Sequence, residues 1–287
     1  MSSPTTERGA DPLPPFGVPL PLRGRIGRVL VIAGSDSGGG AGVQADIKTV
    51  TALGGYAASA ITAVTVQDTL GVHAIHPVPL PVIAAQIRAV LADLGADAIK
   101  TGMLGDAAAI EAVLGVLDDF PGIPLVVDPV MVAKSGAALL ADDAVAALQR
   151  LIARADLVTP NAPEAEALTG LQIVTTDDLR AAGERMLTGG VRAVLMKGGH
   201  VAGESVIDLL MTPAGETVLE GPRIATRHTH GTGCTLASAC ATGVAQGYGL
   251  EQAVARAWAY TGEAIRRAPG FGAGAGPLDH AWPMRRP

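Results

Sequence analysis

Residues 29–43, VLVIAGSDSGGGAGV, pass from an apolar β-type run through a glycine-rich turn into a segment of helical composition. Similar apolar runs, bounded by Gly, Pro, Asp or Asn, recur along the chain as AASAITAVTV, DAIKTGM, PLVVDPVM, LVTPN and VRAVLMKGG. Amphipathic Ala-rich segments such as VIAAQIRAVLADL and AVAALQRLIA lie between them. Because nearly continuous apolar runs are typical of strands covered on both faces, this alternation predicts α/β layers around a mainly parallel sheet. The run VHAIHPV predicts a short extra strand at the sheet edge.

The same pattern predicts a single domain over residues 27–287, because no internal repeat and no second boundary interrupts it. Residues 1–26 are rich in Pro, Gly and polar residues and lack periodicity, which predicts a flexible leader. The 287 residues are 48% hydrophobic, which is enough for one large core or two closely packed lobes.

Composition narrows the class of protein. The net charge of −6 argues against a broad surface for nucleic acid or an anionic membrane, so an anion site must be local. No signal peptide is visible, and no uncharged apolar run reaches the roughly 20 residues of a membrane span. Cys234 and Cys240 lie in one predicted helix, where a separation of six residues turns the chain by about 600° and disfavours a disulfide. These features predict a cytoplasmic protein.

Polar or glycine residues follow five of the apolar runs directly, in SDSGGGAG, VTVQD, KTGML, VVDPVM and VTPNAPE. In open α/β sheets, functional residues gather at the carboxyl ends of the strands. The five stretches together therefore predict one site at this edge of the sheet.

The first glycine-rich turn has two interpretations. Residues 40–45, GAGVQA, satisfy the GxGxxA pattern of dinucleotide-binding folds, but the acidic residue expected about 20 positions further on is missing. The P-loop pattern GxxxxGK[ST] occurs nowhere in the chain. A nucleotide-dependent enzyme of this sequence would therefore need another architecture.

The second glycine-rich turn, residues 230–235 (HGTGCT), opens a helical segment. Free backbone N–H groups and the positive helix end would face one point there, which suits a phosphoryl group. The same field is expected to lower the pKa of the Cys234 thiol. A tight turn with a half-buried cysteine is the alternative, and Cys240 further along is expected in the core.

Asn161 and Glu164 follow the run LVTP at a predicted helix start. A carboxylate and an amide at this spacing can face a hydrated Mg²⁺, which takes only one or two carboxylates. From spacing alone, a helix-capping pair is the stronger interpretation. Lys197 ends the run VRAVLM before two glycines and could reach a nucleotide phosphate or lie in solvent. Gln67 ends ITAVTV and could pair with a donor–acceptor edge or serve as a cap.

Taken in order, long segments of the chain resemble the hydroxymethylpyrimidine/phosphomethylpyrimidine kinase family. The segments are AGSDSGGGAGVQADIKT, ITAVTVQDTLGV, KTGMLG, VVDPVMVAKSG, LVTPNAPEAEALTG, LMKGGH and THGTGCTLASA, within a resemblance from about Arg28 to Trp282. The resemblance implies a ribokinase-like three-layer α/β/α fold and usually a homodimer. It also implies two successive phosphorylations from ATP with Mg²⁺ in thiamine biosynthesis, first of the hydroxymethyl group and then of the monophosphate.

The resemblance also implies a role for individual positions. Gln67 would read the pyrimidine, and its surroundings would be Ala41, Asp46, Met103 and Val130. Gly231, Thr232 and Gly233 would form an anion hole, with Cys234 at the catalytic-base position. Asn161 and Glu164 would act on magnesium and phosphate, Lys197 on the nucleotide, and Lys134-Ser135-Gly136 would form a mobile loop.

Two other functions stay open. The first is a pyridoxine or pyridoxal kinase, which uses the same chemistry on another heteroaromatic alcohol. Many pyridoxal kinases of this superfamily have Asp at the position of Cys234, so by resemblance the cysteine favours the pyrimidine kinases. A non-catalytic nucleotide-binding regulator is the second, and the presence of Cys234, Asn161 and Glu164 argues against it.

Overall fold

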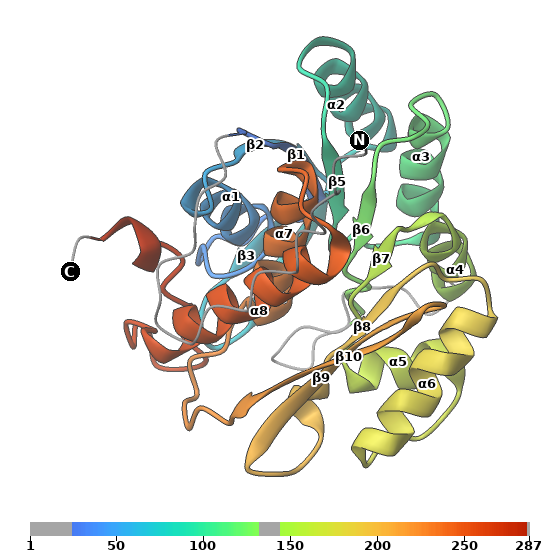
Figure 1. The fold of residues 1–287 in the computed structure, drawn as a ribbon. Coiled ribbons are helices and arrows are strands. Elements are labelled where there is room, and N and C mark those ends of the chain that lie inside the picture. The colour runs from blue at the N-terminus through green and yellow to red at the C-terminus, as the bar shows by residue number, and fades with distance from the viewer. Residues whose placement is uncertain (1–24, 132–143, 286–287) are drawn as a thin grey trace, which may run out of the picture.

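The computed structural model describes residues 25–131 and 144–285. Within these residues the central sheet has eight strands in the order β10-β9-β8-β7-β6-β5-β1-β2 (Figure 1). Strand β9 runs antiparallel to both of its neighbours, and the other neighbouring pairs are parallel. The strands are β1 Arg28–Ala33, β2 Tyr56–Ile61, β5 Ala98–Thr101, β6 Leu125–Val127, β7 Leu157–Val158, β8 Val194–Met196, β9 Ser205–Thr212 and β10 Gly215–Pro222. The predicted mainly parallel sheet is confirmed.

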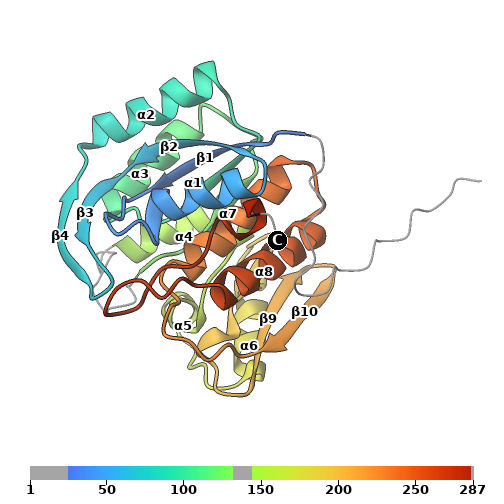
Figure 2. The same cartoon turned by 90° about the vertical axis from the view of Figure 1, so that its left-hand side faces the viewer.

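Helices cover both faces of this sheet, as Figures 1 and 2 show. One face carries α1 Gly42–Ala52, α7 Thr232–Ala245 and α8 Leu250–Arg266. The other carries α2 Leu80–Asp93, α3 Ala107–Leu117, α4 Val145–Arg154, α5 Ala162–Thr169 and α6 Thr176–Thr188. Two short 3₁₀ turns, Gly198–His200 and Trp282–Met284, complete the described helices. The three-layer α/β/α fold predicted from the sequence is therefore confirmed.

Strand β1 shows why its apolar run is nearly continuous. Val29 and Val31 belong to the core on the α1, α7 and α8 side, whereas Leu30 and Ile32 belong to the core on the opposite side. All four side chains are fully buried. A strand with both faces covered is therefore built mainly of apolar side chains along its whole length.

The predicted strand AASAITAVTV is interrupted in the structure. β2 ends at Ile61, and β3 (Ala63–Gln67) leaves the main sheet to pair antiparallel with β4 (Val72–Pro77). The hydroxyl of Thr62, between the two strands, donates to the carbonyl oxygen of Met103 at 2.7 Å. The predicted extra strand VHAIHPV is thus β4, in a two-stranded sheet of its own rather than at the main sheet's edge.

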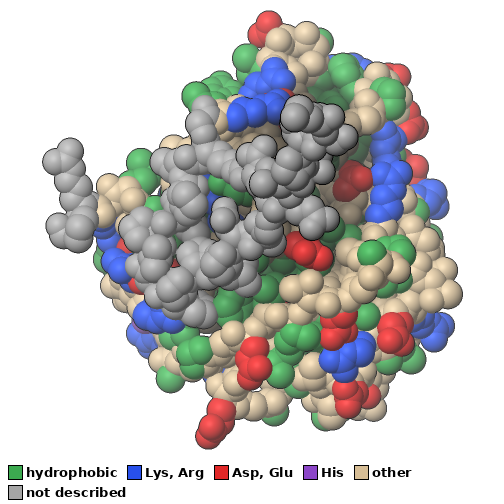
Figure 3. Space-filling view, in the orientation of Figure 1, with side chains coloured by type: hydrophobic (Ala, Val, Ile, Leu, Met, Phe, Trp, Pro, Cys, Tyr) green, Lys and Arg blue, Asp and Glu red, His purple; other side chains and the backbone are tan. Residues whose placement is uncertain are grey.

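The surface carries charges of both signs. Figure 3 shows acidic and basic side chains interspersed over one face of the molecule. Among the described residues, no helix is both long enough and apolar enough to cross a bilayer. Cys234 and Cys240 both lie in α7 and are free thiols, as the helix spacing predicts.

A fully buried ion pair and one hydroxyl group connect strand β5 with helices α1 and α7. Lys100 of β5 donates to both carboxylate oxygens of Asp46 in α1 at 2.9 and 3.0 Å, and the Ser238 hydroxyl of α7 donates to Asp46 at 2.7 Å. Burial opposes the charge on Lys100, but attraction to Asp46 outweighs it and raises the pKa of Lys100. Burial raises the pKa of Asp46, although Lys100 and Ser238 oppose that shift.

Removing one partner of this pair is expected to destabilise the fold strongly. Lys100→Met leaves the Asp46 carboxylate buried without its countercharge, which costs about 3–5 kcal/mol. Denaturant unfolding measures the loss. As a control, Arg88→Met removes the exposed Arg88–Asp119 pair, found at 3.1 Å, and should change stability by less than about 1 kcal/mol. Equal effects of the two substitutions would contradict the structural role of the buried pair.

Candidate active site

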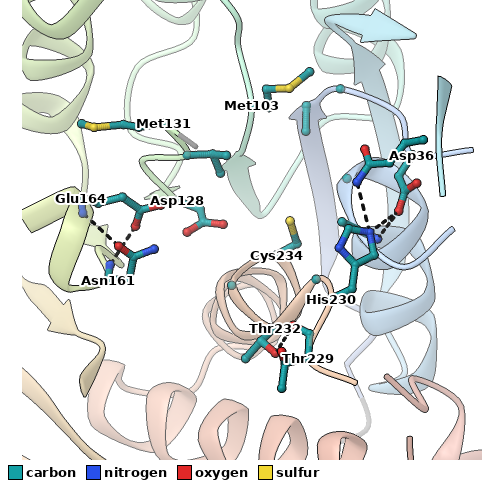
Figure 4. Close-up of a pocket in the computed structure, with 18 of the residues that line it drawn as sticks. Asp36, Met103, Asp128, Met131, Asn161, Glu164, Thr229, His230, Thr232 and Cys234 are labelled. Carbon is teal, nitrogen blue, oxygen red and sulfur yellow. Dashed lines mark hydrogen bonds and ion pairs between the residues drawn. The ribbon is translucent and has the colours of Figure 1, made fainter. Parts of the chain in front are cut away.

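One cavity of about 620 Å³ opens at the carboxyl ends of the strands. Figure 4 shows Cys234 at the start of α7, between Asp36 and His230 on one side and Asp128, Asn161 and Glu164 on the other. Eleven of the residues singled out in the sequence line it together: Ala41, Gln67, Met103, Val130, Asn161, Glu164, Lys197, Gly231, Thr232, Gly233 and Cys234. The predicted convergence of strand ends at one site is therefore what the fold produces.

Asp46 is the exception among the predicted substrate-contacting residues. Its side chain is fully buried in the ion pair with Lys100 and is absent from the cavity wall. A carboxylate that already accepts hydrogen bonds from Lys100 and Ser238 has a structural role below the site. The predicted loop Lys134-Ser135-Gly136 lies outside the described residues.

Asp36 organises the first glycine-rich turn. Its two carboxylate oxygens accept hydrogen bonds from the backbone amides of Gly38, Gly40 and Ala41, at 2.8 to 2.9 Å. The Nε2 atom of His230 lies 2.8 Å from Oδ2 of Asp36. Burial alone would raise the pKa of Asp36, but the bond with His230 and those with the amides outweigh it and hold this pKa below its usual value. The carboxylate is therefore ionised and ties the two glycine-rich turns together.

The two turns approach so closely that only glycine fits at their junction. Gly231, the residue before α7, has a φ of +81°, and a Cβ there would lie 1.8 Å from the carbonyl oxygen of Gly40. At the start of α1, a Cβ on Gly42 would lie 2.3 Å from the carbonyl oxygen of Gly34. The first-turn N–H groups of α7 have no partners within their own helix and lie at the cavity. A helix start that faces a cavity suits an anion, and the anion hole at residues 231–233 stays a prediction.

The predicted low pKa of Cys234 is wrong. The thiol is only partly exposed at the cavity floor, and burial raises its pKa to about 11. The positive charge of Lys100 lowers this pKa, while Asp46 and Asp128 raise it. A backbone hydrogen bond from Gly42 also lowers it, but desolvation is the largest effect. Cys234 is therefore a protonated thiol at neutral pH, and Cys240 is a fully buried core residue.

Asn161 and Glu164 form the helix cap that spacing alone favours. The Asn161 side chain accepts from the Glu164 amide at 2.9 Å, and the Glu164 carboxylate accepts from the Asn161 amide at 2.8 Å. This capping box starts α5 and leaves both side chains in the cavity wall. Burial raises the pKa of Glu164 to about 7, although Lys197 opposes the shift. The pair therefore caps a helix and faces the site at the same time.

Lys197 lies between two carboxylates. Its Nζ atom donates to Asp128 at 3.1 Å and lies 3.9 Å from Glu164. Its backbone amide donates to the carbonyl oxygen of Pro160, which places the lysine beside the α5 cap. Among the described residues, no group of three or more His, Cys, Asp or Glu side chains is arranged to hold a metal ion by itself.

A second cavity of about 230 Å³ adjoins the first. Lys197, Thr229 and Thr232 line both, and the second extends between β9, β10 and α8. On its wall, Asp208 accepts from the Gly198 amide at 2.7 Å and from the indole of Trp258 at 3.1 Å. The two cavities therefore meet beside the start of α7.

Asp36, Asp128 and His230 line the cavity but were not among the site residues proposed from sequence. Asp36 and Asp128 lie in the strand-end stretches SDSGGGAG and VVDPVM, so their position after an apolar run is the only feature of the sequence that indicates a role in the site. His230 is the first residue of the second glycine-rich turn. Its role depends on a contact with Asp36, 194 residues away, which no local pattern reveals.

The chain is similar to known kinases over most of its length. The family model described as phosphomethylpyrimidine kinase matches residues 36–279. The chain belongs to this family. It is 47% identical over 257 residues to a hydroxymethylpyrimidine/phosphomethylpyrimidine kinase of Bacillus subtilis, covering 89% of this chain and 95% of that protein.

Two further relatives place the family in context. A thiamine biosynthesis bifunctional protein of Geobacter sulfurreducens is 50% identical over 255 residues, which cover 88% of this chain and 52% of that protein. The crystal structure of an ADP complex of Bacillus subtilis pyridoxal kinase has a TM-score of 0.84 at 33% identity, covering 90% of this chain and 98% of that one. The phosphomethylpyrimidine kinase fold of this chain is thus shared with kinases of a second heteroaromatic alcohol.

Alkylation of Cys234 tests the raised thiol pKa. Because only the thiolate reacts, the rate with iodoacetamide should rise about tenfold per pH unit and continue rising to about pH 10. Peptide mass spectrometry assigns the label, with Cys234→Ala as the unlabelled control, since Cys240 is fully buried. A rate that levels off near pH 8 would show that the thiol has an ordinary or lowered pKa.

Proposed function

We propose that this chain phosphorylates 4-amino-5-hydroxymethyl-2-methylpyrimidine and then its monophosphate, using ATP, as a kinase of thiamine biosynthesis. The observation that carries this proposal is that Gln67 and the loop 231–234 line one cavity. An amide that can pair with a ring edge and an anion-binding helix end therefore share the space of one small molecule. The family match and the named relatives support the same activity.

The pyrimidine lies in the larger cavity in this proposal. Its ring edge pairs with the Gln67 amide, and Ala41, Met103 and Val130 supply the surrounding contacts. The hydroxymethyl group then points toward Cys234 and the first turn of α7. ATP occupies the second cavity, and its terminal phosphate reaches Lys197 and Thr232, which line both spaces.

Positioning and charge stabilisation supply most of the rate in such phosphoryl transfers. The substrate hydroxyl oxygen forms the new bond to phosphorus as the bond to the leaving ADP oxygen breaks. The amides of residues 231–234 stabilise the negative charge on the transferring group. Cys234 accepts the hydroxyl proton only as a thiolate, which its pKa of about 11 makes scarce at neutral pH. The anion hole therefore contributes more than the base.

The residues present fit magnesium bound together with a nucleotide. Glu164 and Asp128 place two carboxylates on the cavity wall, and Mg²⁺ in nucleotide sites uses one or two carboxylates plus phosphate oxygens and water. When bound, the ion would neutralise charge on the phosphates. Without the ion, the positive charge of Lys197 partly neutralises the two carboxylates. Its Nζ atom lies 3.1 Å from Asp128 and 3.9 Å from Glu164.

Turnover of three phosphoryl acceptors tests the proposed function. ADP release is expected with the hydroxymethylpyrimidine and with its monophosphate, and to be weaker with pyridoxine. Gln67→Ala should raise the KM for the pyrimidine several-fold and leave the KM for ATP unchanged, since the lost hydrogen bonds are worth on the order of 1–3 kcal/mol. Turnover of pyridoxine alone would overturn the proposal. An equal rise in both KM values would assign Gln67 a structural role.

The magnesium requirement tests the role of Glu164. Glu164→Gln keeps an oxygen for the Asn161 amide, so the cap survives, but removes the negative charge. The Mg²⁺ concentration for half-maximal activity should rise several-fold with little change in melting temperature. The matched control is Asp178→Asn in the exposed capping box of α6. Wild-type magnesium dependence in Glu164→Gln would leave that residue only its capping role.

The homodimer and the cytoplasmic location stay predictions from sequence. Sedimentation velocity tests the first and cell fractionation the second. The extent of the single domain and the leader before residue 27 also stay predictions, and limited proteolysis with mass spectrometry tests them.

A further inference from the structure

The β3–β4 hairpin stands outside the main sheet and needs support from other parts of the chain. In the described sheets β3 pairs only with β4, and a two-stranded hairpin is marginally stable on its own. Along β3, the Thr65 hydroxyl donates to the Ser35 carbonyl oxygen at 2.8 Å, and the Ser37 hydroxyl donates to the Gln67 carbonyl oxygen at 2.6 Å. These bonds hold β3 beside the first glycine-rich turn and leave the tip at residues 68–71 to be held by something else.

The tip of the hairpin docks on residues 271–277, FGAGAGP, called here the C-terminal segment. Thr69, at the tip, accepts two hydrogen bonds from this segment. Its hydroxyl oxygen accepts from the Gly274 amide at 3.2 Å, and its carbonyl oxygen accepts from the Ala275 amide at 2.9 Å. Figure 2 shows the segment, in red, reaching the tip of the hairpin. Thr69 and Gly274 are 205 residues apart, so no local pattern predicts this contact.

Glycine at alternate positions lets the C-terminal segment approach its neighbours this closely. A Cβ on Gly274 would lie 2.0 Å from the Thr69 carbonyl oxygen, and one on Gly272 would lie 2.3 Å from the Thr69 hydroxyl oxygen. On the other side, a Cβ on Gly276 would lie 2.3 Å from Nδ1 of His228. Gly272 also has a positive φ of +83°, whereas Gly274 has none, so only the lack of space excludes alanine at Gly274.

The same segment holds the loop before α7. The His230 amide donates to the Gly276 carbonyl oxygen at 3.1 Å, and the Gly276 amide donates to Nδ1 of His228 at 3.2 Å. His230 lines the larger cavity and is followed directly by Gly231, the residue before α7. The C-terminal segment therefore connects two walls of the cavity, the hairpin and the start of α7, without lining the cavity itself.

We propose that Thr69 is a positioning residue for the phosphoryl acceptor, because it docks the hairpin on the C-terminal segment and so sets the width of the larger cavity. Thr65 and Gln67 of β3 line one side of that cavity, and residues 232–234 line the other. A displacement of about 1 Å between groups that hold a reactant can lower a rate by about a hundredfold. Within the described chain, neither the hairpin nor the C-terminal segment lines the second cavity, so nucleotide binding is left unchanged.

This inference rests on the proposed function and is tested by the kinetics of Gly274→Ala with the hydroxymethylpyrimidine and ATP. The added methyl group would lie 2.0 Å from the Thr69 carbonyl oxygen, where ordinary contacts begin at 3.4 Å, so the tip of the hairpin must move. The kcat/KM for the pyrimidine should fall at least about tenfold, and the KM for ATP should stay within about twofold of wild type. The control is Gly115→Ala in α3, where a Cβ meets nothing within 4 Å and both constants should stay at their wild-type values.

A pair of substitutions at Thr69 tests the hydroxyl without changing the backbone contact. Thr69→Val keeps the shape of the side chain but offers no acceptor to the Gly274 amide, whereas Thr69→Ser keeps the acceptor. Thr69→Val should raise the KM for the pyrimidine several-fold at an unchanged KM for ATP. Thr69→Ser should recover most of the wild-type value. This pair decides the matter where Gly274→Ala fails to fold.

Three results would overturn this inference alone. They are a wild-type kcat/KM for the pyrimidine in folded Gly274→Ala, equal kinetics of Thr69→Val and Thr69→Ser, and a fall in kcat that only matches a loss of folded protein while both KM values stay unchanged. The last is how a merely structural contact behaves, and thermal unfolding of each variant measures it. Absence of turnover of the hydroxymethylpyrimidine by wild type would overturn the proposed function and this inference with it.

Discussion

The buried ion pair between Lys100 and Asp46 sets the positions on which the site depends. Asp46 belongs to α1, which follows the first glycine-rich turn, and Ser238, its third partner, belongs to α7, which follows the second. Both helices are thereby held on β5. A buried pair of this kind contributes little net stability compared with apolar side chains, yet it tolerates no displacement of one partner. It therefore determines where the two turns meet.

The close junction of these turns produces the chemistry of the cavity. Gly231 and Gly40 approach within a distance that excludes any Cβ, and Asp36 bridges the turns through His230. One turn brings the first-turn amides of α7 and the thiol of Cys234, and the other lies beside Gln67. In the proposed function, ring recognition and phosphoryl stabilisation therefore both depend on a single contact between loops. The positive charge of Lys100 lies below that contact and partly offsets the effect of burial on Cys234.

The sequence predicts the layers well because strands buried on both faces leave a clear apolar signal. Val29 to Ile32 show this directly, since neighbours point into opposite cores. The break at Thr62 is not visible, because the residues on both sides are apolar and the direction of β3 depends on tertiary contacts. The β9–β10 hairpin has no such continuous run on β10, whose side chains alternate between buried and exposed at its end.

Site residues at strand ends were predictable as a group, but their properties depend on distant partners. Desolvation and the carboxylates of Asp46 and Asp128 raise the pKa of Cys234, and its place at a helix start in the sequence does not reveal them. The family resemblance predicts that Asp46 contacts the substrate. In the structure, an ion pair with Lys100, 54 positions away, holds Asp46 below the cavity. Asn161 and Glu164 both cap α5 and line the cavity, so the two interpretations of the pair are compatible.

A crystal structure with the aminopyrimidine alcohol and a non-hydrolysable ATP analogue tests the central claim most directly. The account predicts the ring edge on the Gln67 amide, the hydroxymethyl oxygen at hydrogen-bonding distance from Cys234, and the terminal phosphate on the amides of residues 231–234. A ring bound away from Gln67, or a hydroxymethyl group directed away from α7, would contradict it.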